Sequence, residues 1–386
     1  MAEWPRVRLA DVADIQAGFA FKSADYCEPS EGVRLLRGDN VIQRGLRWEG
    51  AKYFPRQAAS QYCAYLLREH DVVVAMDRPW IEAGLKVASI RQNDLPALLV
   101  QRVARLRTLT PELHQEFVTW VMYAREFTDH VLAVQTGTAV PHISSRQIGD
   151  YAFCLPPLPV QRRITAVLGA LDDLIETNQK LASLTEQFAI ALVRTNPDTV
   201  PLSDVTVTAA GSTRPHGVVD HYSLPAFDAG RVPKREGAAS IRSNKIAIER
   251  PSVLVSRLNP HIPRVWMAYP DSQAMAVAST EFVVLSGEQT EYVWAACASS
   301  TFIEAMQALV TGTTGSHQRV DKGELARLPI ADPHAADSRT AEAVKRLVRE
   351  ANGSRSAAVT LRRTRDELLP LLMSGRVSPG EVDLGV

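Results

Sequence analysis

Residues 154–193 read CLPPLPVQRRITAVLGALDDLIETNQKLASLTEQFAIALV, a double proline followed by a long helical pattern. From Ile164 the larger side chains recur at alternating spacings of three and four residues, which is the heptad pattern of a helix packed along a second helix. The stretch predicts a helix over residues 159–197 with a partner-facing seam. The seam positions are Ile164, Val167, Leu171, Leu174, Asn178, Leu181, Thr185, Phe188 and Leu192. Asn178 falls at an a position, where a buried amide fixes register at some cost in stability.

A weaker version of this pattern lies within residues 334–386. Its positions are Val344, Leu347, Ala351, Ser354, Ala358, Leu361, Arg365, Leu368 and Leu372. The small residues in its middle would let two helices approach closely. We therefore expect two coiled-coil helices that pack on each other, each of roughly 36 residues and about 54 Å long at 1.5 Å per residue. That length is close to about sixteen base pairs of DNA at ~3.4 Å per pair.

Each predicted helix follows a segment of the same design, because the chain repeats itself at a separation of 175 to 193 residues. Leu9, Asp11, Val12 and Gly18 in the first copy are matched by Leu202, Asp204, Val205 and Gly211 in the second. Further on, a Thr-Gly-Thr sequence precedes a histidine by the same spacing in both copies, starting at Thr136 and at Thr311, and a Leu-Pro pair follows. Such a repeat indicates two related globules. Because each helix follows its own globule, the simplest closed arrangement packs the helices antiparallel.

Both copies mix strand-like runs with one helical pattern, so the predicted fold class is α+β. The runs lie at residues 33–36, 71–76 and 98–100, and at 252–255, 275–278 and 281–285. They are β-rich and bounded by turn residues. The helical patterns lie at 111–130 and 290–309. The aromatic stripe of the first, Phe117, Trp120 and Phe127, is predicted to be core. The expected domains are globules at residues 1–158 and 198–333, joined by helices at 159–197 and 334–386.

Composition removes several classes of function. With 43 basic and 43 acidic residues the net charge is zero, so overall basicity gives no argument for nucleic-acid binding, although a local basic surface remains open. The four cysteines lie far apart, without a CxxC or Cys/His cluster, so neither a disulfide framework nor a metal site is indicated. No stretch approaches the roughly 18 apolar residues that a membrane span needs. We expect a cytoplasmic protein without membrane contact.

The junction Cys154-Leu155-Pro156-Pro157-Leu158-Pro159-Val160-Gln161-Arg162-Arg163-Ile164, with Leu168-Gly169-Ala170-Leu171-Asp172 after it, resembles the corresponding junction of type I restriction-modification DNA specificity subunits. Val160 stands where that family usually has glutamate. Also similar are the Leu-x-Asp-Val opening of each copy, the stretch Leu36-Arg37-Gly38-Asp39-Asn40-Val41, and the loop from Gly137 to Ser144. The resemblance spans the whole chain. It implies two target-recognition domains, a central helix and a C-terminal helix.

What the resemblance implies for function is a non-enzymatic subunit that selects an asymmetric, bipartite sequence in double-stranded DNA. Each globule would read one half-site, and the helices would set the unspecified gap. Two modification subunits would dock on the helices and supply S-adenosylmethionine for adenine methylation. For restriction, an endonuclease/translocase subunit would add ATP and Mg chemistry. This chain itself would bind no cofactor.

The catalytic motifs of adenine methylation are missing from the sequence. There is no Asn/Asp-Pro-Pro-Tyr/Phe, since Asn259-Pro260-His261-Ile262 is a poor imitation, and no GxxxxGK[ST] phosphate loop. We therefore expect the chain to bind rather than to catalyse.

Candidate DNA contacts are residues of the types that read bases or hold phosphates, placed in loops and after strand ends. In the first globule they are Arg78, Lys86, Arg102, Thr136, Thr138, His142, Ser144 and Arg146. In the second they are Arg257, Asn259, His261, Arg264, Thr311, Thr313, Ser316, His317 and Arg319. The competing interpretation is that the Gly and Thr residues only shape the loops and that the two histidines pack or cap.

Two other functions stay open on the sequence. A two-headed coiled-coil scaffold or adaptor would bind proteins rather than DNA. A self-contained methyltransferase would bind S-adenosylmethionine without a partner.

Overall fold

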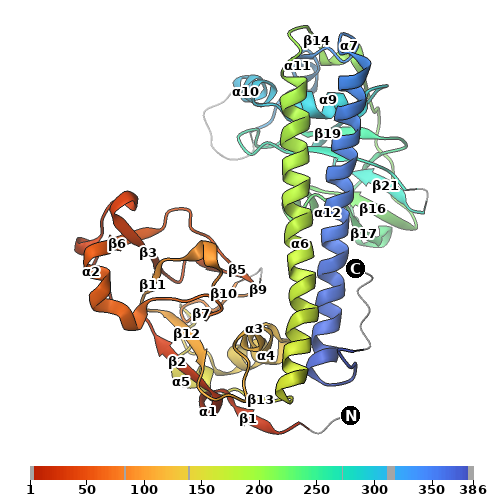
Figure 1. Ribbon diagram of the computed structural model, residues 1–386. Helices are drawn as coiled ribbons and strands as arrows, with labels where there is room; N and C mark the ends of the chain where they lie inside the picture. The colour runs from red at the N-terminus through yellow and green to blue at the C-terminus, as the bar shows by residue number, and fades with distance from the viewer. Residues whose placement is uncertain (1–3, 82–83, 138–139, 272, 311–317, 381–386) are drawn as a thin grey trace. The chain divides into compact units, whose positions relative to one another are not determined.

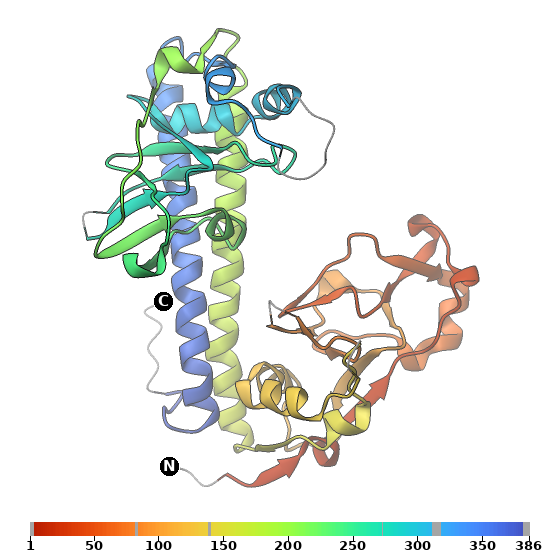
Figure 2. The ribbon, with the colours of Figure 1, turned by 180° about the vertical axis from the view of Figure 1, so that it is seen from behind.

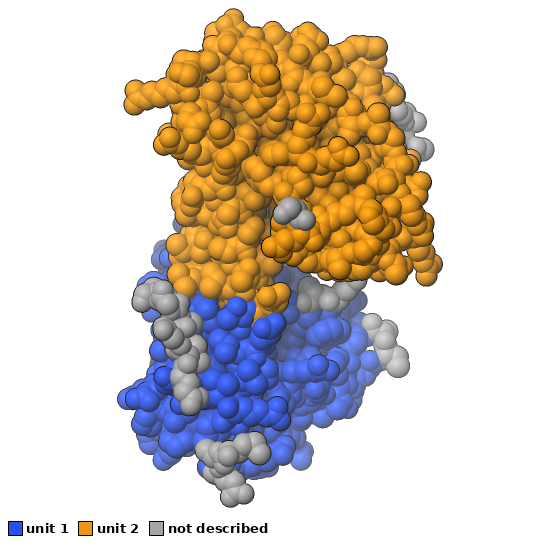
Figure 3. Space-filling model, turned by 90° about the vertical axis from the view of Figure 1, so that its right-hand side faces the viewer, with its two compact units in different colours: residues 1–171, 364–386 blue, residues 172–363 orange. Residues whose placement is uncertain are grey.

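The computed structural model describes residues 4–81, 84–137, 140–271, 273–310 and 318–380, which belong to two compact units. Unit 1 is formed by residues 1–171 and 364–386, and unit 2 by residues 172–363 (Figure 3). Two long helices, α6 (Leu158–Val193) and α12 (Ser338–Met373), contribute a length to each unit (Figure 1). Both long helices predicted from the sequence are present. The units differ from the four expected segments because the division falls within the helices.

Unit 1 contains an antiparallel sheet with strand order β10–β7–β12–β2 and a smaller sheet of order β11–β3–β6. The strand β7, with three consecutive valines, is wholly buried at the centre of its sheet, as expected for a β-branched run. The strands are β2 (Ala13–Ala17), β3 (Gly32–Leu36), β6 (Lys52–Pro55), β7 (Val72–Ala75), β10 (Val87–Ser89), β11 (Ala97–Leu99) and β12 (Val103–Thr108), with the short pairs β1 (Arg6–Arg8) and β13 (Ala152–Cys154), β4 (Val41–Ile42) and β5 (Gly45–Leu46), and β8 (Trp80–Ile81) and β9 (Gly84–Leu85). The helices are α1 (Leu9–Val12), α2 (Arg56–Ala59), α3 (Gln115–Tyr123), α4 (Arg125–Val134) and α5 (Ser145–Gly149).

Unit 2 has the same plan, with sheets of order β20–β19–β22–β15 and β17–β16–β21–β18. Its strands are β14 (Thr199–Pro201), β15 (Val207–Thr208), β16 (Val218–Tyr222), β17 (Lys234–Gly237), β18 (Ile246–Ala247), β19 (Ser252–Ser256), β20 (Val265–Ala268), β21 (Met275–Ala278), β22 (Phe282–Ser286) and β23 (Pro329–Ala331). Its helices are α7 (Leu202–Val205), α8 (Leu224–Asp228), α9 (Thr290–Cys297), α10 (Ser300–Ala308) and α11 (Lys322–Ala326).

The two units share one topology, which is the structural form of the sequence repeat. In chain order, β2, β3, β6, β7, β10, β11 and β12 correspond to β15, β16, β17, β19, β20, β21 and β22. Each second sheet even keeps its single parallel pair, β11 with β3 and β21 with β16. The α+β fold class is therefore confirmed in both copies.

The matched glycines of the repeat are required for different reasons. A Cβ on Gly18 would lie 2.2 Å from the carbonyl oxygen of Val100, so only glycine allows the chain to pass there. Gly211 has open space around it but a φ of +82°, a conformation that side chains with a Cβ rarely adopt. The glycine is therefore required at equivalent positions of the two copies for two reasons, a close backbone contact at Gly18 and a positive φ at Gly211.

Each single helix predicted after the strands is in fact a pair of helices. The first pattern breaks at Ala124, whose backbone is extended, so that α3 ends and α4 begins around it. The second breaks before α10, where the hydroxyl of Ser299 accepts a hydrogen bond from the amide of Phe302 and caps the new helix. In each pair the first helix contacts the sheet, α3 against β10 and β12 and α9 against β19 and β20, and the second helix packs on the first. The predicted aromatic stripe is buried as core.

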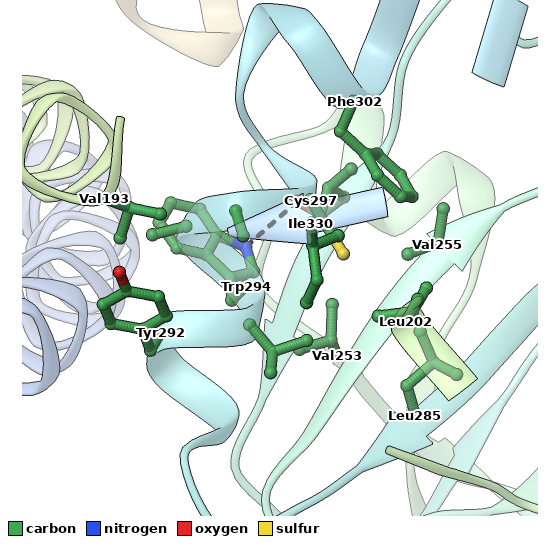
Figure 4. Close-up of a cluster of buried hydrophobic side chains, with 14 of the residues drawn as sticks. Val193, Leu202, Val253, Val255, Leu285, Tyr292, Trp294, Cys297, Phe302 and Ile330 are labelled. Atoms are coloured by element: carbon green, nitrogen blue, oxygen red, sulfur yellow. Dashed lines mark hydrogen bonds between the residues drawn. The ribbon is translucent and has the colours of Figure 1, made fainter. Parts of the chain in front are cut away.

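The core of unit 2 lies where its sheet, α9 and the two long helices meet. In Figure 4, Val193 and Tyr292 face each other on the helix side, and Val253, Val255 and Leu285 line the sheet side. The indole nitrogen of Trp294 donates a hydrogen bond to the carbonyl of Val265 (3.4 Å), which satisfies its polar group inside the core. Figure 2 shows the same unit from behind, with α6 and α12 side by side.

The predicted seam of α6 is partly wrong. Ile164 and Leu171 are buried, but Leu181 and Phe188 are exposed. Half-buried positions are Val167, Leu174, Asn178, Thr185 and Leu192, and the fully buried ones lie one residue further on, at Leu168, Ile175, Ala182, Ala189 and Val193. At two of these positions in the unit 2 part of the helix, Ala182 and Ala189, an alanine faces inward while the larger Leu181 and Phe188 stay exposed, because a small side chain lets the neighbouring backbone approach.

In α12 the buried positions include the predicted Val344, Ala351, Ser354, Ala358, Arg365 and Leu372. Leu347, Leu361 and Leu368 are only half-buried, and Val348 and Leu369 take the buried places beside them. Asn178 donates its amide to the carbonyl of Leu174 (2.8 Å) in its own helix. The side chain is therefore hydrogen-bonded within α6, which weakens the expectation that it sets the register between the two helices.

Gln161 anchors the start of α6 and is fully buried. Its Oε1 accepts from the amide of His114 (2.8 Å), and its Nε2 donates to the carbonyls of Glu112 and Pro156 (2.7 Å each). The junction glutamine thus fastens the helix to the segment preceding α3, within unit 1.

We expect Gln161→Ala to lower the free energy of unfolding of unit 1 by about 2–4 kcal/mol, since it leaves buried backbone groups without partners at ~1–3 kcal/mol each. Urea denaturation with amide hydrogen exchange on unit 1 measures the change. Gln179→Ala, at an exposed position of the same helix, is the control and should change stability by less than about 0.5 kcal/mol. Equal stability of the two variants would contradict the anchoring role.

Over the ranges that the structure describes, no helix combines the length and the apolar character needed to cross a membrane.

Candidate nucleic-acid interface

Unit 1 contains a cleft of about 1220 Å³ to which several chain segments contribute. The loop after β3 (residues 37–39), the end of β7 (77–78) and the turn before β12 (101–102) line it. Its cationic side chains are Arg37, Lys52, Arg78, Lys86 and Arg102, and the carboxylates of Glu28, Glu31, Asp39 and Asp77 line it as well. The structure therefore brings together Arg78, Lys86 and Arg102, three predicted contacts that are up to 24 positions apart in the sequence.

Asp77 connects the predicted loop to this cleft. Its carboxylate lies 2.7 Å from Nδ1 of His142 and 3.5 Å from Nε of Arg102. The backbone joins the same segments, because the amide of Arg78 donates to the carbonyl of Pro141 (2.7 Å). His142 is therefore held at the edge of the cleft by a carboxylate that lines it.

Lys86 is the buried cation of the cleft. Burial lowers the pKa of its ammonium group, and the nearby carboxylates of Asp39 and Asp77 oppose that shift. An ammonium group that has lost most of its hydration gains more from an anion than an exposed lysine does. The position suits a phosphate group of a nucleic acid.

The remaining unit 1 candidates have structural roles or lie elsewhere. Thr136 exchanges backbone hydrogen bonds with His142 (2.9 and 2.7 Å) and closes the loop. Ser144 caps α5, and its hydroxyl bonds to Gln147, so it has a structural role, and its contact with DNA stays a prediction. Arg146 is exposed on α5 but does not line the cleft. Thr138 lies outside the described residues.

Sequence reasoning missed most of the lining of the cleft, including the charged residues Glu28, Glu31, Arg37, Asp39, Lys52 and Asp77. Arg37 lies in the Leu36 to Val41 stretch that carried part of the family resemblance, so a signal for it existed. Asp77 directly follows a predicted strand and precedes Arg78, but the predicted DNA contacts include no acidic residue. Nothing in the sequence around Lys52 marks it.

Unit 2 repeats the backbone frame of this site. In each unit, amides at the end of one strand donate to carbonyls in the strand beside it, in the turn before the next strand, and in the loop before the short capped helix. In unit 1 these bonds run from Ala75 N to Lys86 O (3.0 Å), from Met76 N to Arg102 O (2.8 Å) and from Arg78 N to Pro141 O (2.7 Å). The corresponding bonds of unit 2, in the same order, run from Ser256 N to Arg264 O, from Arg257 N to Glu281 O and from Asn259 N to Gln318 O (2.9 Å each). The return bonds, from Ile143 N to Met76 O (2.9 Å) and from Val320 N to Arg257 O (3.1 Å), also match.

This frame corrects the sequence alignment of the two loops. His142 bridges to Asp77, and Arg319 bridges to Leu258, so Arg319 rather than His317 occupies the place of His142. The predicted offset was wrong by two residues because the Thr-Gly-Thr match was taken as the reference point. Thr311, Thr313, Ser316 and His317 lie outside the described residues.

The cations of unit 2 are held by carboxylates. Arg264 makes two hydrogen bonds to Asp228 (2.7 and 2.8 Å), and Arg319 makes two to Glu281 (2.7 and 3.1 Å). The hydrogen bonds to Glu281 raise the pKa of Arg319, which stays charged. Arg257 is half-buried, with its Nε in the interior, and His261 is exposed. Among described side chains, no group of three or more His, Cys, Asp or Glu residues could hold a metal ion.

Residues 1–186 match the family model of the type I restriction modification DNA specificity domain. The chain is 35% identical over 178 residues to the type I restriction enzyme EcoAI specificity subunit of Escherichia coli, an alignment that covers 46% of this chain and 29% of that protein. It is 30% identical over 178 residues to the MjaVIII specificity subunit of Methanocaldococcus jannaschii, covering 46% of this chain and 41% of the relative. The chain thus spans less than half the length of the curated relatives it matches.

The whole chain has the fold of a solved structure, the type I restriction-modification S subunit from M. genitalium. That likeness has a TM-score of 0.58 at 13% identity and covers 96% of each chain. Two α+β domains joined by long helices are therefore the fold of both proteins. By sequence, residues 1–186, which contain most of unit 1 and the cleft described above, are similar to type I restriction-modification DNA specificity domains.

Proposed function

We propose that this chain is the DNA-sequence-recognition subunit of a type I restriction-modification complex. The observation that carries the proposal is the repeated backbone frame: four backbone hydrogen bonds beside the cleft of unit 1, the unit that is similar to a DNA specificity domain, recur at equivalent places in unit 2. Two copies of one backbone frame in a single chain suit a bipartite DNA target, with one half-site bound by each unit.

The residues at equivalent places differ in chemistry, and this supports an asymmetric target. Arg78 corresponds to Asn259, Lys86 to Arg264, and His142 to Arg319. Arginine favours guanine, asparagine favours adenine, and lysine binds phosphate or guanine. Because the two units share a backbone frame but carry different side chains on it, we expect them to bind half-sites of different sequence. Carboxylates such as Asp77 and Glu281 would hold the cations in position for that contact.

The modification subunits that would carry out methylation need a surface on this chain. Leu184 and Phe188 are 63% and 59% exposed on α6, and Leu181 lies on the same side one turn earlier. Large apolar side chains at spacings of three and four form one stripe on a helix, and such exposed stripes mark protein interfaces. We propose that the Leu181–Leu184–Phe188 stripe receives a modification subunit, which supplies S-adenosylmethionine and the catalytic groups. The chain itself contributes recognition and no catalysis.

The test is binding by the assembled complex. The chain, co-purified with the modification subunits encoded beside it, should shift a duplex carrying the bipartite motif found by methylome sequencing of the same cells. A duplex of scrambled sequence should bind at least about 1,000-fold more weakly, the usual margin of specific over non-specific binding.

Equal binding of both duplexes would exclude sequence recognition and favour the protein-binding adaptor. Tight binding of S-adenosylmethionine by the chain without partners, measured by isothermal titration calorimetry, would instead favour a self-contained methyltransferase.

A further inference from the structure

Both units present the same four-residue motif at the mouth of the repeated frame. It consists of a residue in the left-handed backbone region, a proline, an aromatic ring and an isoleucine. The two motifs are Arg78-Pro79-Trp80-Ile81 and Asn259-Pro260-His261-Ile262. The first residue has a φ of 45° in unit 1 and 49° in unit 2.

The motifs are equivalent in space as well as in sequence. Each begins three residues after the strand-end amide of the frame, at Ala75 and at Ser256. Arg78 and Asn259 each donate their backbone amide to the loop before the short capped helix. The chain returns at Lys86 and Arg264, so the two insertions differ in length while their first residues correspond. The frame therefore fixes the backbone at both ends of each insertion.

The aromatic–isoleucine pairs are exposed, which is unusual for such side chains. Trp80 and Ile81 are 43% and 37% exposed, Ile262 is 47% exposed, and His261 is also on the surface. The left-handed conformation is readily adopted by asparagine but not by arginine, so at Arg78 it is maintained against the residue's own preference. Strained, exposed positions of this kind concentrate at binding sites.

Charge indicates what covers the pair in unit 1. Trp80 and Ile81 form the strand β8, which pairs with β9. Arg78 and Lys86 flank this hairpin in the sequence, and both line the cleft of unit 1 together with carboxylates such as Asp39 and Asp77. An exposed apolar pair flanked by two cations matches duplex DNA, where phosphates border base edges and stacked rings, better than it matches an apolar protein surface.

We propose that the aromatic–isoleucine pair of each motif is a base-contacting element, Trp80–Ile81 for one half-site and His261–Ile262 for the other. The inference rests on the proposed function and adds the residues that make direct contact. Apolar side chains contact bases either at the methyl group of thymine or by inserting between base pairs. The shared chemistry is an apolar contact with the bases.

The test uses the assembled complex with Trp80→Ala/Ile81→Ala and, separately, His261→Ala/Ile262→Ala. Each double variant should bind the cognate duplex roughly 5- to 150-fold more weakly, the range that corresponds to a lost base contact. Affinity for a random duplex should stay unchanged. Scrambling the half-site read by the altered unit should cost the variant less affinity than it costs the wild type, whereas scrambling the other half-site should cost both equally.

Matched controls remove exposed apolar side chains outside the motifs. Leu132→Ala in unit 1 and Val218→Ala in unit 2 should leave binding of every duplex unchanged.

Two probes separate the forms of contact. Replacing thymine by uracil in the affected half-site removes the methyl group and should weaken the wild type only, if that group is contacted. A rise in 2-aminopurine fluorescence on binding, absent in the variant, would show an unstacked step. A loss of affinity with neither probe responding would overturn the proposal, because the contact would not be with the bases.

The proposal would also fail if both double variants bound cognate DNA like the wild type. Lost assembly with the modification subunits at normal folding would show that the pairs bind protein. If the wild-type complex itself does not discriminate between duplexes, the proposed function has failed, and this outcome is distinct from the others.

Discussion

Leu184→Asp/Phe188→Asp should prevent the chain from assembling with its modification subunits. Both side chains are largely exposed on α6, so two aspartates leave the core of unit 2 intact but place charges in an apolar interface. Interface hot spots cost about 2 kcal/mol or more each, so affinity should fall by about 100-fold or more. Size-exclusion chromatography and isothermal titration calorimetry with the purified modification subunit measure the loss.

A matched charge elsewhere keeps this result interpretable. Leu109→Asp places an aspartate at an equally exposed position of unit 1 and should leave assembly unchanged. If the double variant assembled normally, the stripe would not be the docking surface. A variant that no longer unfolded cooperatively would be replaced by Leu184→Ala/Phe188→Ala, which should weaken assembly in the same direction without introducing charge.

Asp71→Ala should cause the largest loss of stability in unit 1, about 3–5 kcal/mol, because it removes the buried carboxylate that pairs with the half-buried guanidinium of Arg107. The Asp71 side chain is almost wholly buried and accepts two hydrogen bonds from Arg107 (2.5 and 2.7 Å) and one from the amide of Arg68 (2.7 Å). Amide hydrogen exchange on unit 1 during urea denaturation gives the value. Asp71 begins the segment that carries Asp77 and Arg78, so the cleft should also lose its order.

The control for Asp71 is Asp129→Ala, which removes an exposed carboxylate paired with Arg125 at 3.7 Å. Surface pairs contribute about 0–1 kcal/mol. Similar losses for the two variants would mean that the Arg107–Asp71 pair is not what holds this segment.

The long-range plan of the molecule could be predicted from the sequence because it depends on periodic signals. The heptad patterns predicted the helices α6 and α12, and the repeated opening and loop sequences predicted two α+β copies. The family resemblance pointed to the same arrangement. Those features average over many residues, so single errors do not change them.

The failures come from positions where one contact decides. Large side chains were assigned to the α6 seam by size, whereas close helix packing placed Ala182 and Ala189 inside and left Phe188 outside. The break at Ala124 has no glycine, proline or capping side chain to announce it. The sequence match makes His142 equivalent to His317, whereas the backbone bridges make it equivalent to Arg319. Lys52 enters the cleft through tertiary folding alone.

If each unit recognises its own half-site independently of the other, exchanging the globule of one unit should change only one half-site. Residues 1–158 are replaced by the equivalent segment of a related specificity subunit with a known target, and the chimera is expressed with its modification subunits. Methylome sequencing then reports the recognised motif. One half of the bipartite motif should change to that of the donor, while the other half and the gap between them stay as in the wild type. A motif in which both halves change together, or neither does, would contradict the division of recognition between unit 1 and unit 2.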